Sequence, residues 1–195
     1  MDKNITTKHV IVTGVAGGMG RETAIYLRDA GYSVIGLDLK PVKIEGVECI
    51  RIDLTDSKAI GRLATKLAKR EISLYAIVHQ AGIYDLDSLI EVDEERFRRI
   101  FEVNLYSIYY LNRAMIGLMD KGSRVIVTSS ELAPLMPLPF TGLYAITKTA
   151  IERYAFSLRH ELNLLGMHVS ILRPGATDTG LLGDSPREDL YEVSY

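Results

Sequence analysis

Short apolar stretches alternate along the chain with longer stretches in which apolar residues recur at helical spacing. The short stretches are rich in β-branched residues and are apolar at consecutive positions, which is typical of strands covered on both faces. The pattern predicts six strands, at residues 10–12, 33–37, 48–52, 74–78, 124–128 and 168–172.

Helical periodicity fills most of the intervals between these strands. Gly31 is a favoured residue just past a helix end, and Thr55 is a candidate N-cap for the helix that follows it. Strands that alternate with helices favour an α/β fold, a doubly wound, Rossmann-like parallel sheet in three α/β/α layers. No repeat or linker interrupts the pattern, so residues 1–195 are interpreted as a single domain. The predicted helices span residues 19–30, 56–70, 93–119 and 141–165.

Composition narrows the functional classes. The 195 residues are 47% hydrophobic and 25% charged, as in an ordinary globular domain. A net charge of −2 without blocks of like charge gives no reason to expect a nucleic-acid partner. The single cysteine, Cys49, excludes an intramolecular disulfide and favours a reducing compartment. No stretch has the pattern of a signal peptide or a membrane span, so we expect a cytoplasmic protein without a membrane partner. We expect no metal site.

A glycine-rich loop closes the first strand and opens the first helix. Gly14, Gly18 and Gly20, with Met19 between the last two, form a G-x-x-x-G-x-G pattern. Residues without a Cβ let the backbone approach a pyrophosphate, whose charge meets the free N–H groups at the helix start. A tight turn alone would need fewer glycines. The loop therefore predicts a dinucleotide cofactor.

Asp38 ends the second predicted strand. A carboxylate there can accept hydrogen bonds from both ribose hydroxyls of an adenosine and repels a 2′-phosphate, which favours NAD over NADP. Lys40, two positions on, is the one feature against this preference. The alternative is that Asp38 is a turn residue at a strand end.

The helix predicted at 141–165 begins with two polar residues on its apolar face. Tyr144 and Lys148 share the stripe that apolar residues continue as far as Leu162. In one interpretation Lys148 extends out to solvent and the Tyr144 hydroxyl is exposed. In the other, both side chains face a pocket at the carboxyl edge of the sheet, where ligands bind in such folds.

Two further polar residues stand out. Asn104 interrupts an apolar stripe on the helix predicted at 93–119, and a buried amide needs partners. It could bond a neighbouring backbone carbonyl, organise a water chain, or do both. Ser130 ends the fifth strand at the same edge of the sheet, where serine is also a common turn former.

Together, in this order and spacing, these motifs resemble the short-chain dehydrogenase/reductase family over nearly the whole chain. The resemblance implies that Asn104, Ser130, Tyr144 and Lys148 form the catalytic set, and that Asp38 binds the adenosine ribose. The remaining implied cofactor-binding residues are Gly14, Gly18, Met19, Gly20, Asp53, Leu54, Ala81, Gly82, Pro174, Gly175 and Thr179.

The resemblance implies an NAD-dependent oxidoreductase that moves a hydride between NAD(H) and a secondary alcohol or ketone, with Tyr144 as general acid/base. The positive charges of Lys148 and of an oxidised nicotinamide are expected to lower the pKa of that phenol. A non-catalytic NAD(H)-sensing or scaffold protein on the same fold is the alternative. The apolar run that follows Ser130 predicts an apolar pocket mouth at Leu132, Leu135, Met136, Leu138, Phe140 and Leu143.

The chain departs from the family pattern in three places. His79 and Gln80 stand where the family commonly has two asparagines, and Ser130 lies one residue further from Tyr144 than expected. The chain also stops soon after the Pro-Gly turn, so a C-terminal substrate-covering part is expected to be missing. Apolar residues off the core stripes of the two long helices predict a homodimer or homotetramer, with Leu105, Tyr109, Ile146 and Phe156 in its helical contact.

Overall fold

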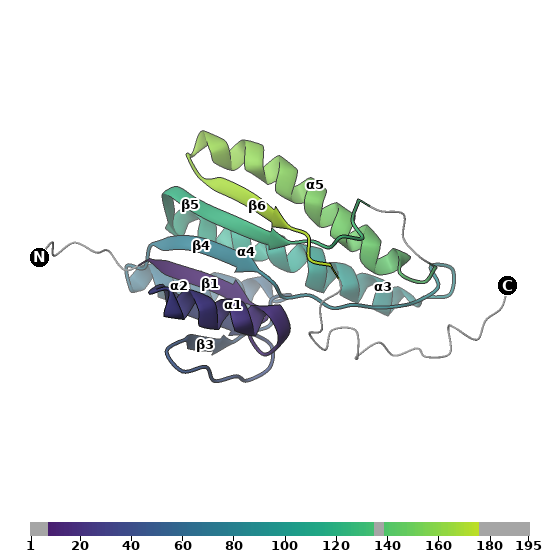
Figure 1. Ribbon diagram of the computed structural model, residues 1–195, viewed down its shortest axis with the longest axis horizontal. Helices are drawn as coiled ribbons and strands as arrows, with labels where there is room; N and C mark the ends of the chain where they lie inside the picture. The colour runs from purple at the N-terminus through teal and green to yellow at the C-terminus, as the bar shows by residue number, and fades with distance from the viewer. Residues whose placement is uncertain (1–7, 135–138, 176–195) are drawn as a thin grey trace, which may run out of the picture.

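The computed structural model describes residues 8–134 and 139–175. Its centre is a parallel sheet of six strands in the order β3-β2-β1-β4-β5-β6 (Figure 1). The order reverses between β1 and β4, and ligands bind at such a switch point in doubly wound folds. The strands are β1 (His9–Thr13), β2 (Ser33–Asp38), β3 (Glu48–Arg51), β4 (Leu74–His79), β5 (Met119–Thr128) and β6 (His168–Leu172).

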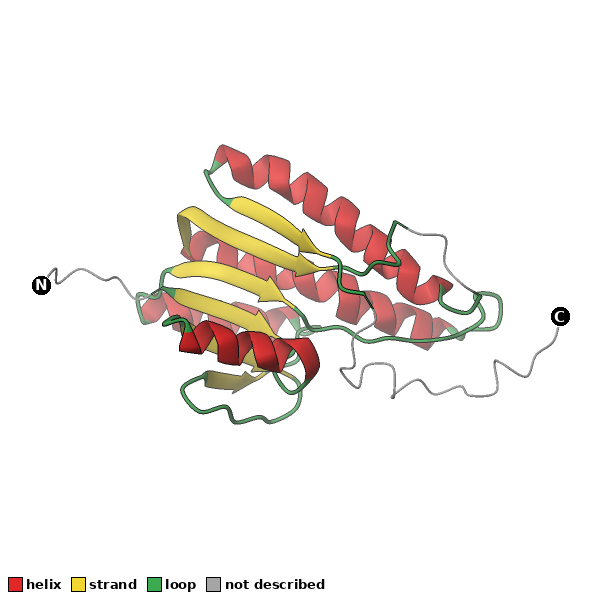
Figure 2. Cartoon of the chain, viewed as in Figure 1, coloured by secondary structure: helices red, strands yellow, loops and turns green. Residues whose placement is uncertain are grey.

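Helices cover both faces of this sheet (Figure 2). Helix α1 lies on one face, and the other described helices lie on the opposite face (Figure 1). This is the predicted doubly wound α/β/α arrangement. The α-helices are α1 (Gly18–Asp29), α2 (Ser57–Lys69), α3 (Glu94–Phe101), α4 (Ser107–Met115) and α5 (Gly142–Leu164).

Each strand contributes side chains to both faces because successive residues point in opposite directions. Ile11 and Ile77 join the larger core under α2, α4 and α5. Val12 and Val78, the next residues along, join the core on the α1 side. All four side chains are at most 4% exposed, so the central strands are buried on both faces as their uninterrupted apolar patterns predict.

Three boundaries differ from prediction. The helix predicted at 93–119 is interrupted by a π-helical segment, Glu102–Tyr106, and ends in a 3₁₀ turn, Ile116–Leu118. Strand β5 begins at Met119, although only 124–128 has a strand pattern. Thr55 does not cap α2. Asp56 does, because its carboxylate accepts hydrogen bonds from two backbone N–H groups of the first turn, whereas the Thr55 hydroxyl donates to Asp53 at 2.7 Å.

Among residues 8–134 and 139–175, no helix has both the length and the apolar character needed to cross a membrane. The same residues contain no cluster of histidine, cysteine or carboxylate side chains that could hold a metal ion.

Candidate active site

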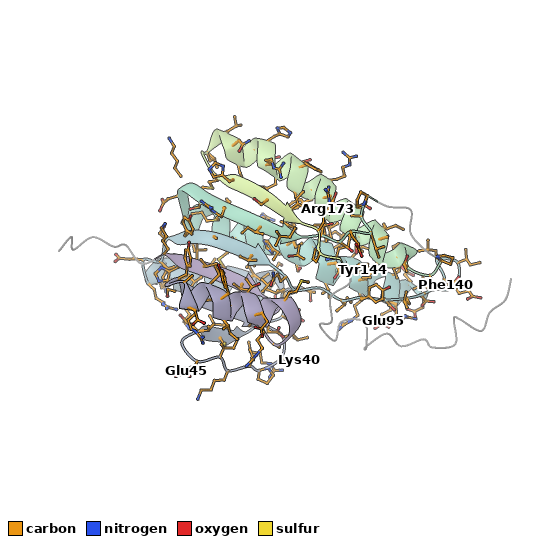
Figure 3. All side chains as sticks on the ribbon, viewed as in Figure 1. Lys40, Glu45, Glu95, Phe140, Tyr144 and Arg173 are labelled. Atoms are coloured by element: carbon orange, nitrogen blue, oxygen red, sulfur yellow. The ribbon has the colours of Figure 1, made fainter. Side chains whose placement is uncertain are left out.

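A cavity of about 870 Å³ opens at the carboxyl ends of the strands, beside the switch point between β1 and β4. Tyr144 lies at this end of the molecule, and Lys40 lies near the start of α1 (Figure 3). The cavity is lined by the glycine loop, by the ends of β2, β4, β5 and β6, and by the start of α5. The residues predicted from sequence that line it are Gly14, Gly18, Met19, Gly20, Asp38, Asp53, Leu54, Ala81, Gly82, Ser130, Tyr144, Lys148, Pro174 and Gly175.

The glycine loop leaves no room for side chains at two positions. Gly14 has a φ of +75°, and a Cβ on it would lie 2.9 Å from the backbone nitrogen of Ala81. A Cβ on Gly20 would lie 2.1 Å from the carbonyl oxygen of Gly14. Helix α1 starts with no side-chain cap and no acidic residue in its first turn. Its first N–H groups and positive dipole end are therefore available to an anion, as the pyrophosphate of a dinucleotide requires.

Thr13 ties the glycine loop to the end of β4. Its hydroxyl oxygen accepts hydrogen bonds from the backbone nitrogens of Gln80 at 3.0 Å and Ala81 at 2.9 Å. The threonine at the head of the glycine motif therefore fixes the strand end that carries Ala81 and Gly82.

Asp38 lines the cavity and also shapes it. One carboxylate oxygen accepts a hydrogen bond from the backbone nitrogen of Ala16 in the glycine loop at 2.9 Å. The other oxygen accepts a hydrogen bond from the backbone nitrogen of Lys40 at 2.9 Å. This bond makes Asp38 a turn residue at the strand end, as the alternative interpretation predicted. The turn is therefore confirmed, and ribose binding by Asp38 stays a prediction. Lys40, Asp53 and Leu54 line the same end of the cavity.

Tyr144 is buried at the start of α5, 8% exposed. The ring of Tyr84, from the loop after β4, packs edge-on against it with centroids 4.8 Å apart. Burial raises the pKa of the Tyr144 phenol, and a hydrogen bond with the Ser130 side chain lowers the pKa in part. The Ser130 side chain, just after β5, is thus hydrogen-bonded to the Tyr144 phenol on α5.

Lys148 lies one turn further along α5 and does not extend to solvent. Its side chain is 5% exposed, and Nζ donates a hydrogen bond to the Thr128 carbonyl oxygen at 3.0 Å. Nζ lies 5.4 Å from the centroid of the Tyr144 ring. Burial lowers the pKa of Lys148 to about 8. In the protein alone burial is the largest influence on the Tyr144 phenol, and its pKa is raised.

Asn104 lies behind the cavity wall rather than on it. The amide is fully buried in the π-helical segment. Oδ1 accepts from the backbone nitrogen of Ile83 at 2.8 Å, and Nδ2 donates to the Ile83 carbonyl oxygen at 2.9 Å and to the Thr147 hydroxyl at 3.1 Å. The predicted bond to a neighbouring backbone carbonyl is confirmed. A Cβ on Gly82 would lie 3.3 Å from Asn104 Oδ1 and 3.8 Å from Lys148 Nζ, so these three residues meet at one point.

An ion pair holds the end of β6. Arg173 donates to both carboxylate oxygens of Glu152 on α5, at 2.6 and 2.8 Å. This bidentate contact positions Pro174 and Gly175 at the cavity. Thr179 lies outside the described residues, so its predicted contact with the nicotinamide carboxamide stays a prediction.

Sequence reasoning missed several residues of the cavity wall and expected others wrongly. Tyr84, Arg99 and Glu131 line the cavity, and Glu131 could have been suspected because it follows Ser130 directly. Leu132 lines it as expected. Leu143 does not, because it packs into the core with Ile100 and Tyr144. Phe140 also lies away from the wall, and Leu135, Met136 and Leu138 are outside the described residues.

Comparison with known proteins identifies the family. A family profile described as short chain dehydrogenase matches residues 8–189, so the chain belongs to this family. It is 29% identical to an uncharacterized oxidoreductase, YbbO, of Escherichia coli, over 90% of this chain and 68% of that protein. It is 30% identical to 1-hydroxy-2-glutathionyl-2-methyl-3-butene dehydrogenase of a Rhodococcus species, over 93% of this chain and 83% of that protein.

Solved structures show the same fold. Ligand-free aldohexose dehydrogenase of Thermoplasma acidophilum superposes with a TM-score of 0.84 at 25% identity, over 92% of this chain and 74% of that one. As a member of this family, the chain is an oxidoreductase of a class that uses NAD or NADP.

Proposed function

We propose that the protein is an NAD-dependent oxidoreductase that interconverts a secondary alcohol and a ketone, with Tyr144 as the proton-transferring residue. One observation carries the proposal. Ser130, Tyr144 and Lys148 line one cavity together with the glycine loop, and Asn104 supports the backbone beside them. A protein that only senses NAD(H) needs the glycine loop and Asp38, so the complete set favours an enzyme.

The residues at the cavity fit a dinucleotide. Side chains at 14 and 20 are excluded by the backbone, and the start of α1 offers free N–H groups to a pyrophosphate. Asp38 would meet the adenosine ribose, and its negative charge disfavours a 2′-phosphate. Asp53 and Leu54 would flank the adenine, and Ala81 and Gly82 would line the cofactor. Pro174 and Gly175 would lie against the nicotinamide. When bound, the cofactor supplies the hydride acceptor or donor.

The chain's own residues would handle the proton. Ser130 would donate a hydrogen bond to the substrate oxygen, and Tyr144 would take the hydroxyl proton during oxidation or return it during reduction. A buried phenol with a raised pKa is a weak base, so the deprotonated form needs nearby positive charge. Lys148 supplies it and would hold the nicotinamide ribose. Asn104 fixes the Ile83 backbone and would position a water that relays the proton to solvent.

Replacing Tyr144 with phenylalanine tests this proposal. The substitution keeps the ring packing against Tyr84 and removes only the hydroxyl. We expect NAD binding to survive while turnover of secondary alcohols falls by at least about a hundredfold, the scale of acid–base catalysis. Lys148→Ala should reduce both NAD binding and turnover. Calorimetric titration with NAD and steady-state rates measure the two effects.

Tyr26→Phe is the matched control, because Tyr26 is 73% exposed on α1 and does not line the cavity. It should leave both quantities unchanged. Retention of more than about a tenth of the activity by Tyr144→Phe would place the proton transfer elsewhere. An unmodified protein that binds NAD yet oxidises no alcohol across a broad panel would favour the sensor.

A further inference from the structure

Glu131 occupies a fixed position beside the proposed reaction centre. It follows Ser130 directly, and its backbone nitrogen donates a hydrogen bond to the Pro174 carbonyl oxygen at 3.1 Å. Residues from the ends of two neighbouring strands, β5 and β6, therefore hold its backbone in place, and Glu131 itself is exposed. One carboxylate oxygen, Oε2, lies 3.1 Å from where a Cβ on Gly175 would stand. The absence of a side chain at 175 makes room for this carboxylate.

The charge of Glu131 is not neutralised by the part of the chain that the structure describes. Arg173, the nearest arginine in sequence, is held by both oxygens of Glu152. Lys148 donates to a backbone carbonyl, and Arg99, which lines the same cavity, forms no ion pair with Glu131 among the described residues. A carboxylate in this position has accepting lone pairs directed to solvent or to a bound molecule.

The neighbours of Glu131 determine what that molecule would offer. Ser130 and Tyr144 would hold the oxygen of the carbinol, and Glu131 is the next residue after Ser130. Because Ser130, Glu131 and Tyr144 line the same cavity, a molecule held by its carbinol at Ser130 and Tyr144 can present a neighbouring group to the carboxylate. Hydrogen bonds to a charged acceptor are stronger than neutral ones, and an aliphatic group placed there would displace water from the carboxylate without replacing its hydrogen bond.

We propose that Glu131 selects secondary alcohols that carry a hydrogen-bond donor, a hydroxyl or an ammonium, on the carbon next to the carbinol. The inference rests on the proposed function and names its substrate class. It adds a charged acceptor beside Ser130 to the apolar pocket mouth expected from sequence, of which Leu132 lines the cavity.

Three compounds of matched size test the preference. 2-Butanol, 1,2-propanediol and 1-amino-2-propanol share the carbinol and differ only in a methyl, hydroxyl or ammonium group. Binding of each to the protein saturated with NAD is measured by calorimetry, and oxidation is followed through NADH absorbance. We expect the unmodified protein to favour the diol and the amino alcohol over 2-butanol by at least about tenfold, the range of a charge-assisted hydrogen bond.

Two substitutions separate charge from hydrogen bonding. Glu131→Gln keeps an acceptor without charge, so it should lose most of the preference for the ammonium and keep most of that for the hydroxyl. Glu131→Leu should reverse the order in favour of 2-butanol. Glu45→Gln, on an exposed loop away from the cavity, is the matched control and should change nothing (Figure 3).

Equal binding of all three compounds, or preferences that survive in Glu131→Leu, would overturn the inference and leave the proposed function standing. Binding preferences that follow Glu131 without any oxidation would support the inference and count against the proposed function. A carboxylate that is merely hydrated at the cavity rim gives the first outcome.

Discussion

Burial decides which protonation state Lys148 and Tyr144 favour at the cavity. Lys148 is a buried cation whose one described hydrogen bond goes to a backbone carbonyl, and burial lowers its pKa to about 8. Burial likewise raises the pKa of Tyr144. Both shifts mean that the folded protein disfavours the charged form of each group. A positive charge brought in beside Tyr144 would compensate, which makes cofactor binding and proton transfer interdependent.

Asp38 carries the prediction of cofactor preference. Asp38→Asn keeps a side-chain oxygen that can accept from Ala16 and removes the negative charge. We expect NADP binding to strengthen relative to NAD because the repulsion of a 2′-phosphate is relieved. Asp38→Ala should weaken NAD binding and also reduce the difference between the affinities for NAD and NADP. Calorimetric titration of both cofactors measures the ratio.

Asp53→Asn tests whether the effect is specific, since Asp53 lines the same end of the cavity and its carboxylate bonds Thr55. The ratio of NAD affinity to NADP affinity should change less in Asp53→Asn than in Asp38→Asn. Equal or tighter binding of NADP by the unmodified protein would show that Lys40, and not Asp38, determines the preference.

At the level of helices and strands, two independent sequence patterns pointed to the same cavity: polar residues at the ends of strands, and polar residues on the apolar stripe of a helix. The carboxyl ends of parallel strands lie at one edge of the sheet, so these polar residues come together there independently of the loop conformations. Tyr144 and Lys148 were therefore placed correctly. Tyr84 and Glu131 lie on loops after β4 and β5, whose paths depend on tertiary contacts such as the Thr13 hydroxyl bonds and the Glu131–Pro174 bond. The spacing of apolar residues along the chain, which predicts helices and strands, contains no information on those loop contacts.

The π-helical segment shows the same limit inside a helix. Apolar periodicity predicted one continuous helix through Asn104, and the structure has a wider turn at that residue. Such segments occur often at functional sites. Here the buried Asn104 amide binds both backbone groups of Ile83 across to the loop after β4. The sequence marked Asn104 as exceptional, but a single polar residue does not reveal the backbone change around it.

A buried polar chain joins β4, α4 and α5 and makes stability depend on pH. His79 Nε2 lies 2.8 Å from Asn112 Oδ1, and Asn112 Nδ2 donates to the Tyr154 hydroxyl at 3.2 Å. Burial lowers the pKa of His79 to about 4 from 6.5. As pH falls below 6.5 the unfolded chain takes up a proton that the folded protein refuses, so acidification favours unfolding.

We predict a loss of about 2 kcal/mol in the free energy of unfolding between pH 7 and pH 5 from this residue alone, at about 1.4 kcal/mol per pKa unit. His79→Gln keeps a donor toward Asn112 without titrating, so the slope over this range should flatten. Urea unfolding at each pH measures it. His168→Gln, at an exposed position on β6, should retain the slope of the unmodified protein. An unchanged slope in His79→Gln would assign the acid sensitivity to other groups.

At the scale of the whole molecule, the outer surfaces of α4 and α5 predict self-association. Tyr109 and Ile146 are 41% and 43% exposed, and Phe156 is 37% exposed. Leu105, expected among them, instead packs against the core. The Asn112–Tyr154 bond places the two helices next to each other, and both helices carry exposed apolar side chains. Exposed apolar patches of this kind mark interfaces, and a two-fold axis would pair the helices with their copies.

We predict a symmetric dimer, or a tetramer formed by a second two-fold contact, at micromolar concentration. Introducing a charge at the contact, as in Phe156→Asp, should shift the sedimentation mass toward the monomer because an unpaired carboxylate would be buried in the interface. Tyr26→Asp is the matched control, since Tyr26 is 73% exposed on α1, across the sheet from these helices. A monomeric mass for the unmodified protein, or equal dissociation by both substitutions, would reject the α4–α5 interface and leave these apolar side chains as ordinary solvent-exposed residues.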